Sequence, residues 1–412
     1  MKHILARRIA AGVLCMGLIV SFTPSARRIA AVPGHIIVPA GRADALSGVT
    51  GEPTGSAAVL ASGDERLSSQ DDYVTLSMWG VPVRRVSVSV SEARMVIPGG
   101  HSIGVALRTR GVLVVGVSDV ASEQGAVCPA RAADLRAGEA IVGIGGADVN
   151  SVDEFVNLIE ANGGAPVELT ISGADGLRTA NVTPVLDPHD NCYRVGAWVR
   201  DSTAGVGTLS FYDPESQRYG ALGHAICDVD TGDIMTVADG EILKSDVVSI
   251  REGAKGSPGE LRGAFLERAE RLGSISDNLK CGIYGSMYSG ISNPLYPSGI
   301  AVSNRTLVHT GAAQLLTTLD SGGIRAYDCE ITDVFRQDSP STRSMVLRVT
   351  DPELIKLTGG IVQGMSGSPL IQDGMLIGAV THVFINDPTQ GYGIYIDWML
   401  DAADAVGNAQ AA

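Results

Sequence analysis

The stretch from Gly364 to Val380 constrains the fold of this chain more than any other. It reads Gly-Met-Ser-Gly-Ser-Pro, then an apolar run, Asp373-Gly374, and a second apolar run from Met375. Apolar runs on both sides of Asp-Gly are typical of a β-hairpin, and the flanking glycines predict a sharp bend at Ser366. A serine held in this way lies beside free backbone N–H groups. We therefore predict that Ser366 is a nucleophile.

Composition predicts a soluble chain rich in strands. The 412 residues, 45% of them hydrophobic and 18% charged, can bury a large core, and this length predicts roughly two to three domains. The 51 glycines and the low aromatic content of 5%, with Val, Ile and Thr in short runs, favour many short strands over a helical bundle. The net charge of -14 argues against nucleic acid as a partner, because phosphate binding needs a basic face.

The amino terminus predicts an export segment. Lys2, Arg7 and Arg8 precede an apolar run from Ile9 to Phe22. As a helix this run reaches about 21 Å, short of a hydrocarbon core of about 30 Å. We therefore predict a secretory signal at residues 1–26, with an uncleaved signal anchor as the alternative, and the rest of the chain outside the cytoplasm. The six cysteines are widely spaced and predict no disulfide framework.

Three regions follow the export segment. Residues 27–98 combine strand-like stretches with a linker rich in Gly, Ser and charge. Residues 99–187 alternate strands with two helices, the second capped by Ser151 with Glu154 three residues later. Residues 188–412 have many short strands and few helices, which suggests a β-barrel or paired-barrel enzyme core. The predicted class is mainly β, α+β overall.

Residues 99–187 resemble a PDZ domain, most specifically at Leu135 to Gly146 (LRAGEAIVGIGG). The resemblance implies a groove between a strand and the second helix, in which a peptide adds as an extra strand and its terminal carboxylate binds backbone N–H groups. The loop expected to bind the peptide comprises Ser102, Ile103, Gly104 and Val105. The alternative is a domain that serves only as a spacer or an interdomain clamp.

Three histidines of the last region are candidates to activate Ser366, namely His224, His309 and His382. His224 follows a glycine after a tight turn, where a side chain can project from a barrel edge. Imidazole can take the serine proton at neutral pH and return it to the leaving amine, so we predict His224 as the base. His309 has the context of an ordinary strand residue, and His382 is expected to face the substrate cleft or the core.

The third member of a serine triad must be a carboxylate that holds the imidazole in one tautomer. Asp351 ends a strand-like run 15 residues before Ser366. Its position before Pro352 is also typical of a helix N-cap. The competing candidates are Asp228, Asp246, Asp328 and Asp333.

Taken together, these motifs resemble the stage IV sporulation protein B family of serine peptidases. The segments that carry the likeness are Gly360–Phe384, Asn386-Asp387-Pro388, Pro98–Val105, Leu222-Gly223-His224 and Gly256–Glu260. The resemblance implies a triad of His224 as base, Asp351 as acid and Ser366 as nucleophile. It also extends to most of the chain.

The motif around Ser366 resembles the Gly-Asp-Ser-Gly-Gly-Pro loop of chymotrypsin-like enzymes, with Met365 and Ser368 in place of Asp and Gly. This likeness implies a chymotrypsin-like β-barrel and an oxyanion hole formed by the N–H groups of Gly364 and Ser366. One such donor is typically worth about 2.7 to 4 kcal/mol of transition-state stabilisation. The short separation between Asp351 and Ser366 differs from chymotrypsin, so the acid must come from a different strand or loop.

The family resemblance implies a secreted signalling endopeptidase of sporulation. Such enzymes act between the mother-cell and forespore membranes. They cleave an extracytoplasmic segment of a membrane-bound regulatory protein and thereby activate an intramembrane metalloprotease. The implied partners are that protein substrate, the membrane near the N-terminal segment, and the chain itself through self-cleavage after the signal.

Two other functions fit parts of the sequence. One is a non-catalytic PDZ-bearing scaffold or pseudopeptidase, although all three triad candidates are present. The other is a metal site at His224, Cys227, Asp228 and Asp230. This cluster lacks both a second cluster at zinc spacing and the glutamate of an EF-hand loop. We therefore expect neither a metal nor a cofactor.

Overall fold

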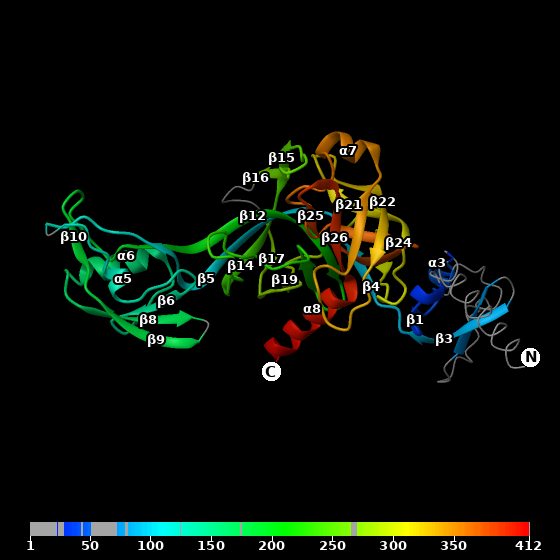
Figure 1. Ribbon diagram of the computed structural model, residues 1–412, viewed down its shortest axis with the longest axis horizontal. Coiled ribbons are helices and arrows are strands. Elements are labelled where there is room, and N and C mark those ends of the chain that lie inside the picture. Colours follow the sequence, from blue (N-terminus) through cyan, green and yellow to red (C-terminus); the bar gives the residue numbers. More distant parts are fainter. Residues whose placement is uncertain are drawn as a thin grey trace, which may run out of the picture.

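The computed structural model is an elongated molecule made mostly of strands (Figure 1). A small sheet lies near the amino terminus, two larger β structures occupy the middle, and a block with two helices forms the other end. No described helix is long and apolar enough to cross a membrane. Of the predicted signal at residues 1–26, only Thr23 lies within the described part of the chain. The structure describes residues 23, 29–42, 44–50, 72–78, 81–123, 125–173, 175–264 and 270–411.

The N-terminal sheet packs against the carboxyl-terminal half of the chain. Its strands follow the order β1-β3-β2, with β1 and β3 parallel. Buried Ile36 and Val86 share one core with Leu307 and Met375, so the sheet has no separate hydrophobic interior. The elements are β1 (His35–Pro39), α3 (Ala45–Thr50), β2 (Asp72–Met78) and β3 (Val81–Ser91).

The block at the other end has its own core, which includes Phe155 and Ile159 of α6 and Leu169 and Ile171 of β8. The predicted cap of α6 is confirmed, since the N–H of Glu154 donates to Ser151 Oγ at 3.2 Å. The elements are α5 (Pro129–Ala132), β6 (Ala140–Ile144), β7 (Ala147–Asp148), α6 (Val152–Ala161), β8 (Val167–Gly173), β9 (Gly176–Val182), β10 (Val185–Asp187) and β11 (Cys192–Arg194).

Two long antiparallel strands connect this block to the middle of the molecule (Figure 1). They are β5 (Ser102–Val117) and β12 (Ala197–Asp213), paired from Ala197 opposite Val117 to Thr208 opposite Ser102. The amino-terminal half of β5 also pairs with β14 (Val237–Lys244). The start of β5 therefore belongs to the sheet of the following region, although residues 99–187 were predicted to form one PDZ-like block.

The structure corrects the predicted peptide-binding loop. Ser102, Ile103, Gly104 and Val105 begin β5 and are all buried. All four pair with β12, and the last three also pair with β14 on the opposite edge. A peptide can join a sheet only at a free strand edge, so these residues cannot receive one. The glycine and the small serine, which suggested a loop, lie instead inside a crowded sheet.

The first of the two middle structures is an open sheet that shares β5 and β12. Its core includes Leu209, Tyr219, Ile242 and Ile283, all fully buried. Its other strands are β4 (Met95–Pro98), β13 (Arg218–Ala221), β17 (Arg271–Ser274), β18 (Asp277–Leu279), β19 (Gly282–Ser286) and β20 (Ile300–Ala301). A separate hairpin consists of β15 (Asp246–Arg251) and β16 (Glu260–Ala264).

The second middle structure is a closed six-stranded barrel, in the order β21-β22-β23-β26-β25-β24. The predicted hairpin is confirmed, since β24 and β25 pair antiparallel on either side of Asp373 and Gly374. A closed barrel beside a partly open one fits the predicted chymotrypsin-like, mainly β fold. The elements are β21 (Gly311–Thr318), β22 (Ile324–Val334), β23 (Met345–Val349), α7 (Pro352–Thr358), β24 (Pro369–Gln372), β25 (Met375–Phe384), β26 (Asp387–Tyr395) and α8 (Ile396–Ala411).

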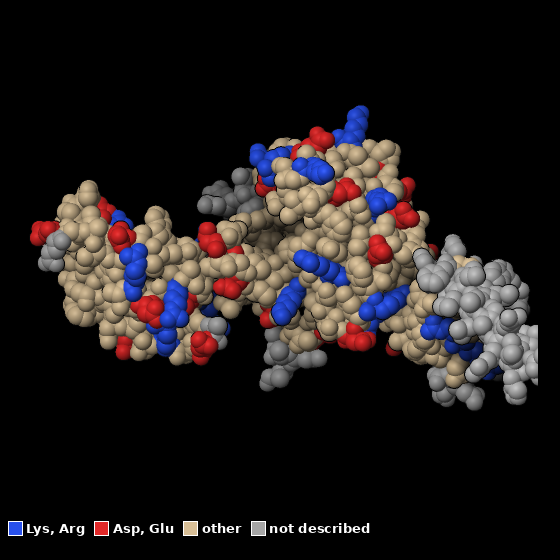
Figure 2. All heavy atoms as spheres, viewed as in Figure 1, with Lys and Arg blue, Asp and Glu red and all other residues tan. Residues whose placement is uncertain are grey.

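Charged side chains of both signs are interspersed on the face shown in Figure 2. Lys and Arg lie among Asp and Glu there and do not form one large basic patch. This face therefore offers no broad electrostatic surface for a polyanion.

Candidate active site

A pocket of about 520 Å³ lies between the open sheet and the closed barrel. Its walls come from β12, from residues 222–227 after β13, from residues 361–366 and from the end of β25. Ser366, His224 and His382 all line it. No Asp, Glu, Lys or Arg is among the described residues of the lining. The site therefore combines a hydroxyl with two imidazoles in uncharged surroundings.

The turn around Ser366 requires its glycines. Gly364 and Gly367 have φ values of 95° and 93°, in the left-handed region that glycine adopts at little cost. A Cβ on Gly367 would lie 2.1 Å from the carbonyl oxygen of Thr208 and 2.5 Å from the nitrogen of Leu222. The turn thus sits directly against β12 and the end of β13, and no larger residue fits there.

Two hydrogen bonds fasten this turn to β12. The N–H of Thr208 donates to the carbonyl of Ser366 at 3.0 Å, and Thr208 Oγ1 donates to the carbonyl of Gly364 at 2.8 Å. Both acceptors are carbonyls of the residues predicted to supply the oxyanion hole. These two bonds fix the orientation of the peptide group between Gly364 and Met365 and of the peptide group between Ser366 and Gly367.

The backbone N–H groups of Gly364 and Ser366 have no hydrogen-bond partner within the described residues. The N–H groups of the alternate residues Met365 and Gly367 are used, by Val362 O at 3.1 Å and Val380 O at 2.7 Å. Two free donors on either side of Met365, next to a serine hydroxyl, can bind the oxyanion of a tetrahedral intermediate. These are the two donors that the sequence predicted.

The Ser366 hydroxyl donates to the carbonyl oxygen of Thr381 at 2.8 Å. Within the described residues it makes no hydrogen bond to either imidazole of the pocket. Nucleophilic attack requires the hydroxyl to give its proton to a base, so the side chain must turn from Thr381 toward a histidine. Catalytic hydrogen bonds often tighten in this way only when substrate binds.

His224 is held as a neutral imidazole with a defined tautomer. Nδ1 lies 2.8 Å from the carbonyl oxygen of Ala225, which can only accept, so Nδ1 carries the proton and Nε2 is left as the basic nitrogen. Burial lowers the pKa of His224, and the Ala225 hydrogen bond opposes this only in part. The residue follows Leu222 and Gly223, with φ values of 68° and 69°. Leu222 is strained in this left-handed conformation, whereas Gly223 adopts it at little cost, and together they turn the chain so that His224 enters the pocket.

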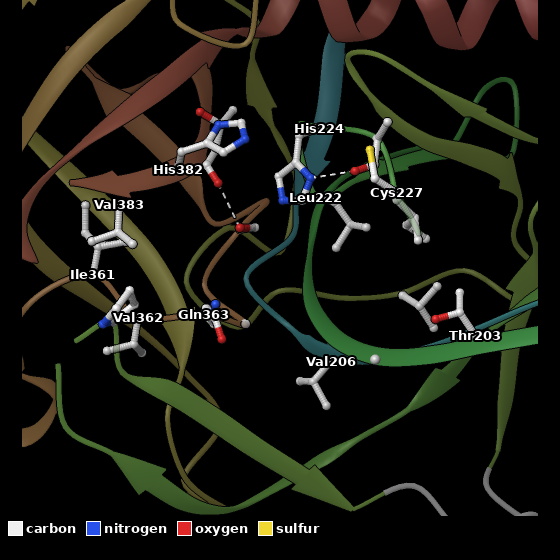
Figure 3. A pocket seen from close by; sticks show the side chains of 18 of the residues that line it. Thr203, Val206, Leu222, His224, Cys227, Ile361, Val362, Gln363, His382 and Val383 are labelled. Atoms are coloured by element: carbon white, nitrogen blue, oxygen red, sulfur yellow. Dashed lines mark hydrogen bonds between the residues drawn. The ribbon is translucent and has the colours of Figure 1, made fainter. Parts of the chain in front are cut away.

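His382 is the second imidazole of the pocket (Figure 3). Its ring centroid lies 5.0 Å from that of His224, with an interplanar angle of 35°. Burial, the positive charge that His224 can carry, and Arg343 lower the pKa of His382 to about 4. Of the two positions expected from the sequence, cleft or core, His382 occupies the cleft.

His309 lies outside the pocket lining. Its Nε2 bonds Asp373 Oδ2 at 2.9 Å and its Nδ1 bonds the carbonyl of Thr310 at 2.9 Å. Both ring nitrogens are therefore engaged on the closed barrel, and His309 cannot act on Ser366 from this position.

The structure does not bring Asp351 to His224. Asp351 is the N-cap of α7, where Oδ1 accepts from the N–H groups of Glu353 at 2.8 Å and Leu354 at 3.0 Å. Oδ2 accepts from the N–H of Asp328 at 3.3 Å. The cap expected from the Asp-Pro pair is thus what forms, and Asp351 is absent from the pocket lining. Its predicted role as the acid finds no support in this geometry.

The residues of the candidate metal site, His224, Cys227, Asp228 and Asp230, do not face one common point. Asp228 and Asp230 bind Arg200 at 2.7 Å and 3.0 Å, while His224 faces the pocket. In the described part of the chain no group of three His, Cys, Asp or Glu side chains is arranged to hold a metal ion.

The two roles of Asp351 can be separated by substitution. We expect Asp351→Ala to lower the free energy of unfolding by about 1 kcal/mol through loss of the cap, whereas Asn caps nearly as well as Asp. Chemical denaturation of Asp351→Asn should therefore match the parent chain. Because the carboxylate lies outside the pocket, we also expect this variant to retain peptidase activity. A large loss of activity in folded Asp351→Asn would contradict the cap as its main role.

Comparison with known proteins places the chain in a family. The model of the SpoIVB peptidase S55 family matches residues 191–400, just over half of the chain. Tricorn protease homolog 1 of Streptomyces coelicolor is 31% identical over 157 residues. That match covers 34% of this chain, and the chain spans only 14% of the length of that curated relative.

Two solved structures show weaker likeness. The Rv3671c protease of M. tuberculosis in its active form is 16% identical, with a TM-score of 0.26, over 49% of this chain and 74% of that one. Human heparin binding protein is 13% identical, with a TM-score of 0.24, over 46% of this chain and 75% of that one. Since the family model covers more than half of the chain and includes both His224 and Ser366, the chain belongs to the SpoIVB peptidase S55 family.

Proposed function

We propose that the chain is an endopeptidase in which Ser366 attacks the carbonyl carbon of a peptide bond. His224 Nε2 takes the hydroxyl proton and then gives it to the leaving amine. The N–H groups of Gly364 and Ser366 bind the developing oxyanion. The observation that carries this proposal is the shared pocket, in which Ser366 and a tautomerically fixed His224 lie beside two unused N–H donors.

The pocket favours an uncharged, apolar substrate residue next to the cleaved bond. Ile361, Val362 and Val383 form an apolar wall on the side of the pocket away from His224 (Figure 3). A charged side chain placed there would lose its hydration without meeting an opposite charge.

The biological role that we propose follows the family. The enzyme cleaves an extracytoplasmic segment of a membrane-bound regulatory protein and so activates an intramembrane protease during sporulation. The N-terminal apolar run, predicted as a signal or anchor, supports a location between the mother-cell and forespore membranes. The alternative is a scaffold that binds such proteins without cleaving them, and a probe that reacts only with an activated serine separates the two.

We expect a fluorophosphonate probe to label the full chain at Ser366 and to leave Ser366→Ala unlabelled. His224→Gln should slow labelling by about 10³-fold or more, because the hydroxyl then lacks its base. Mass spectrometry of the labelled peptide checks the position. Ser368→Ala is the matched control, since Ser368 is fully buried two residues away and should label at the parent rate once folded. A parent chain that does not react would favour the scaffold.

The pH dependence of labelling tests the state of His224. The base must be neutral, and burial holds its pKa below the ordinary value of 6.5. The neutral form therefore persists to lower pH than it does in an ordinary imidazole, and activity is lost only as the pH drops through this lowered pKa. We expect the midpoint of the acidic limb below pH 6.5. A midpoint at or above about pH 7 would contradict a buried imidazole as the base.

We further propose that the PDZ-like block binds a peptide in a different groove from the one predicted. A cavity of about 340 Å³ lies between α6 and residues 192–199, with Phe155, Val156 and Ile159 on the helix side. Residues 197–200 of β12 pair with β5 on one edge only. Their other edge can receive an extended peptide, which is how strand addition operates.

The groove also offers a binding position for a terminal carboxylate. The N–H groups of Val195 and Gly196 have no hydrogen-bond partner within the described residues. Gly196 has a φ of 74°, so the chain bends directly before β12. Free N–H groups at such a bend can hold a carboxylate, as the PDZ resemblance implies.

Binding of peptides to the full chain tests this groove. We expect a fluorescent pool of random hexapeptides with free carboxyl termini and apolar last residues to bind, as measured by anisotropy. Val156→Asp should weaken binding at least about tenfold, because it places a charge among the apolar side chains of Phe155 and Ile159 on the helix side of the groove. Leu177→Asp, on the exposed part of β9 outside the groove, is the control and should bind as the parent does. Equal binding by Val156→Asp and the parent would contradict the assignment.

A further inference from the structure

Arg200 and Asp201 lie in the amino-terminal part of β12, between the residues that line the peptide groove and those that line the catalytic pocket. Residues 197–199 line the groove, and residues 203–206 line the pocket. The pairing of β12 with β5 is irregular between Arg200 and Ser202. Neither Arg200 nor Asp201 lines either cavity. The two residues are therefore placed to connect the cavities without belonging to one of them.

Arg200 holds the loop that follows His224. Its guanidinium donates to Asp228 Oδ2 at 2.7 Å and to Asp230 Oδ2 at 3.0 Å. The Asp228 side chain is 0% exposed, and its Oδ1 accepts from the N–H groups of Asp230 and Thr231, both at 3.0 Å. Removal of Arg200 would leave this buried carboxylate without its counter-charge.

The loop that Arg200 holds also fixes the catalytic base. Ala225, at its start, provides the carbonyl that bonds His224 Nδ1, and Ala225 and Cys227 line the pocket beside His224 (Figure 3). Since no carboxylate lies in the described lining, the tautomer of His224 depends on this backbone carbonyl. The position of Ala225 in turn depends on how this loop is anchored, at Ile226 by two hydrogen bonds with the Asn278 side chain at 2.8 Å and 2.7 Å, and at Asp228 by Arg200.

Asp201 contacts α6, the helix that lines the groove. Its Oδ2 accepts from the N–H of Val152 at 2.9 Å, and Val152 is the first residue of α6. Its own carbonyl accepts from Thr109 Oγ1 at 3.2 Å, which ties the irregular part of β12 to β5. Successive side chains of a strand point to opposite faces, so Arg200 and Asp201 reach the base loop and the groove helix from adjacent positions.

We propose that Arg200 and Asp201 form a mechanical link between α6 and the loop that holds His224, with Arg200 acting as a positioning residue for the base. A peptide seated against α6 then acts on the same strand that anchors Asp228, so occupancy of the groove changes the reactivity of Ser366. This link rests on the proposed peptidase function. In a catalytic triad a carboxylate orients the imidazole. Here the link performs part of that role, because it orients His224 through the backbone carbonyl of Ala225.

Labelling of the full chain with the fluorophosphonate probe tests the Arg200 half. We expect Arg200→Met to slow labelling of Ser366 at least about tenfold, since small displacements of catalytic groups are costly. Arg200→Lys keeps the positive charge but lacks the planar set of N–H donors of arginine, and it should restore part of the labelling rate. If Arg200→Met does not fold, the double variant Arg200→Met/Asp228→Asn, which leaves no unpaired buried charge, replaces it. Labelling at the parent rate in the folded variant would overturn the positioning role.

Arg325 provides the matched control. Like Arg200 it contacts two carboxylates, Asp320 at 3.1 Å and Glu353 at 3.2 Å, but it lies on the closed barrel away from the pocket lining. Arg325→Met should label at the parent rate. A rate reduced as much as in Arg200→Met would show a general effect of losing a bridging arginine, and would overturn the specific role.

Histidine NMR gives a readout that loss of stability alone does not change. In protein labelled with ¹⁵N at histidine, we expect His224 of the parent chain to show the Nδ1–H tautomer. The Arg200 variants should show a mixture of both tautomers. An unchanged tautomer in these variants would contradict control of His224 by the anchored loop.

Hydrogen–deuterium exchange tests the Asp201 half. We expect Asp201→Ala to raise deuterium uptake in residues 225–235 and to slow labelling of Ser366 about threefold, within the usual range of coupling between sites. Uptake and labelling equal to the parent would overturn the coupling. Failure of the proposed peptidase function gives a different result from failure of the coupling, because the parent chain itself then does not react with the probe. The tautomer and exchange measurements still decide the link in that case.

Discussion

The antiparallel pairing of β5 with β12 is the interaction on which the rest of the structure depends. It runs from Ala197 opposite Val117 in the PDZ-like block to Thr208 opposite Ser102 beside the nucleophile turn. At one end β12 lines the cavity beside α6, and further along Thr208 fastens the carbonyls of Gly364 and Ser366. One continuous pair of strands therefore positions both cavities for which we propose a function. It also makes the block an insertion within the first peptidase sheet.

In the proposed active site a backbone carbonyl holds the histidine, where many serine peptidases use a carboxylate side chain. The carbonyl of Ala225 fixes the tautomer of His224, and the N–H groups on either side of Met365 have no partner in the part of the chain that the structure describes. A carbonyl orients an imidazole but carries no full charge, so it stabilises the imidazolium less than a carboxylate would. Burial also opposes protonation of His224 and of the neighbouring His382. The anchoring of the loop by Asn278 and through Asp228 then becomes important, because the Ala225 carbonyl is the hydrogen-bond partner of His224 among the described residues.

Local sequence patterns predicted the local structures well. Glycines at 364 and 367 specify the nucleophile turn because no side chain fits at Gly367. Asp373-Gly374 specifies the hairpin, and Ser151 with Glu154 specifies the start of α6. The failures concern long-range placement. Asp351 followed by Pro352 correctly suggested a cap, yet sequence separation from Ser366 says nothing about which carboxylate reaches His224. Ser102–Val105 resembled a loop because its pairing partners, β12 and β14, lie about a hundred residues or more away.

The sequence by itself determined the mainly β class, the family and the turn around Ser366, and it nominated Ser366 and His224, because each depends on short motifs whose geometry is local. Only the tertiary structure decided which strand edge stays free for a peptide, and that Asp351 caps a helix instead of facing the base. It also decided that Arg200 and Asp201 join two cavities. The physical reason is that a strand edge is free or occupied according to its distant partners, and a carboxylate acts on whichever groups the fold brings within hydrogen-bond reach.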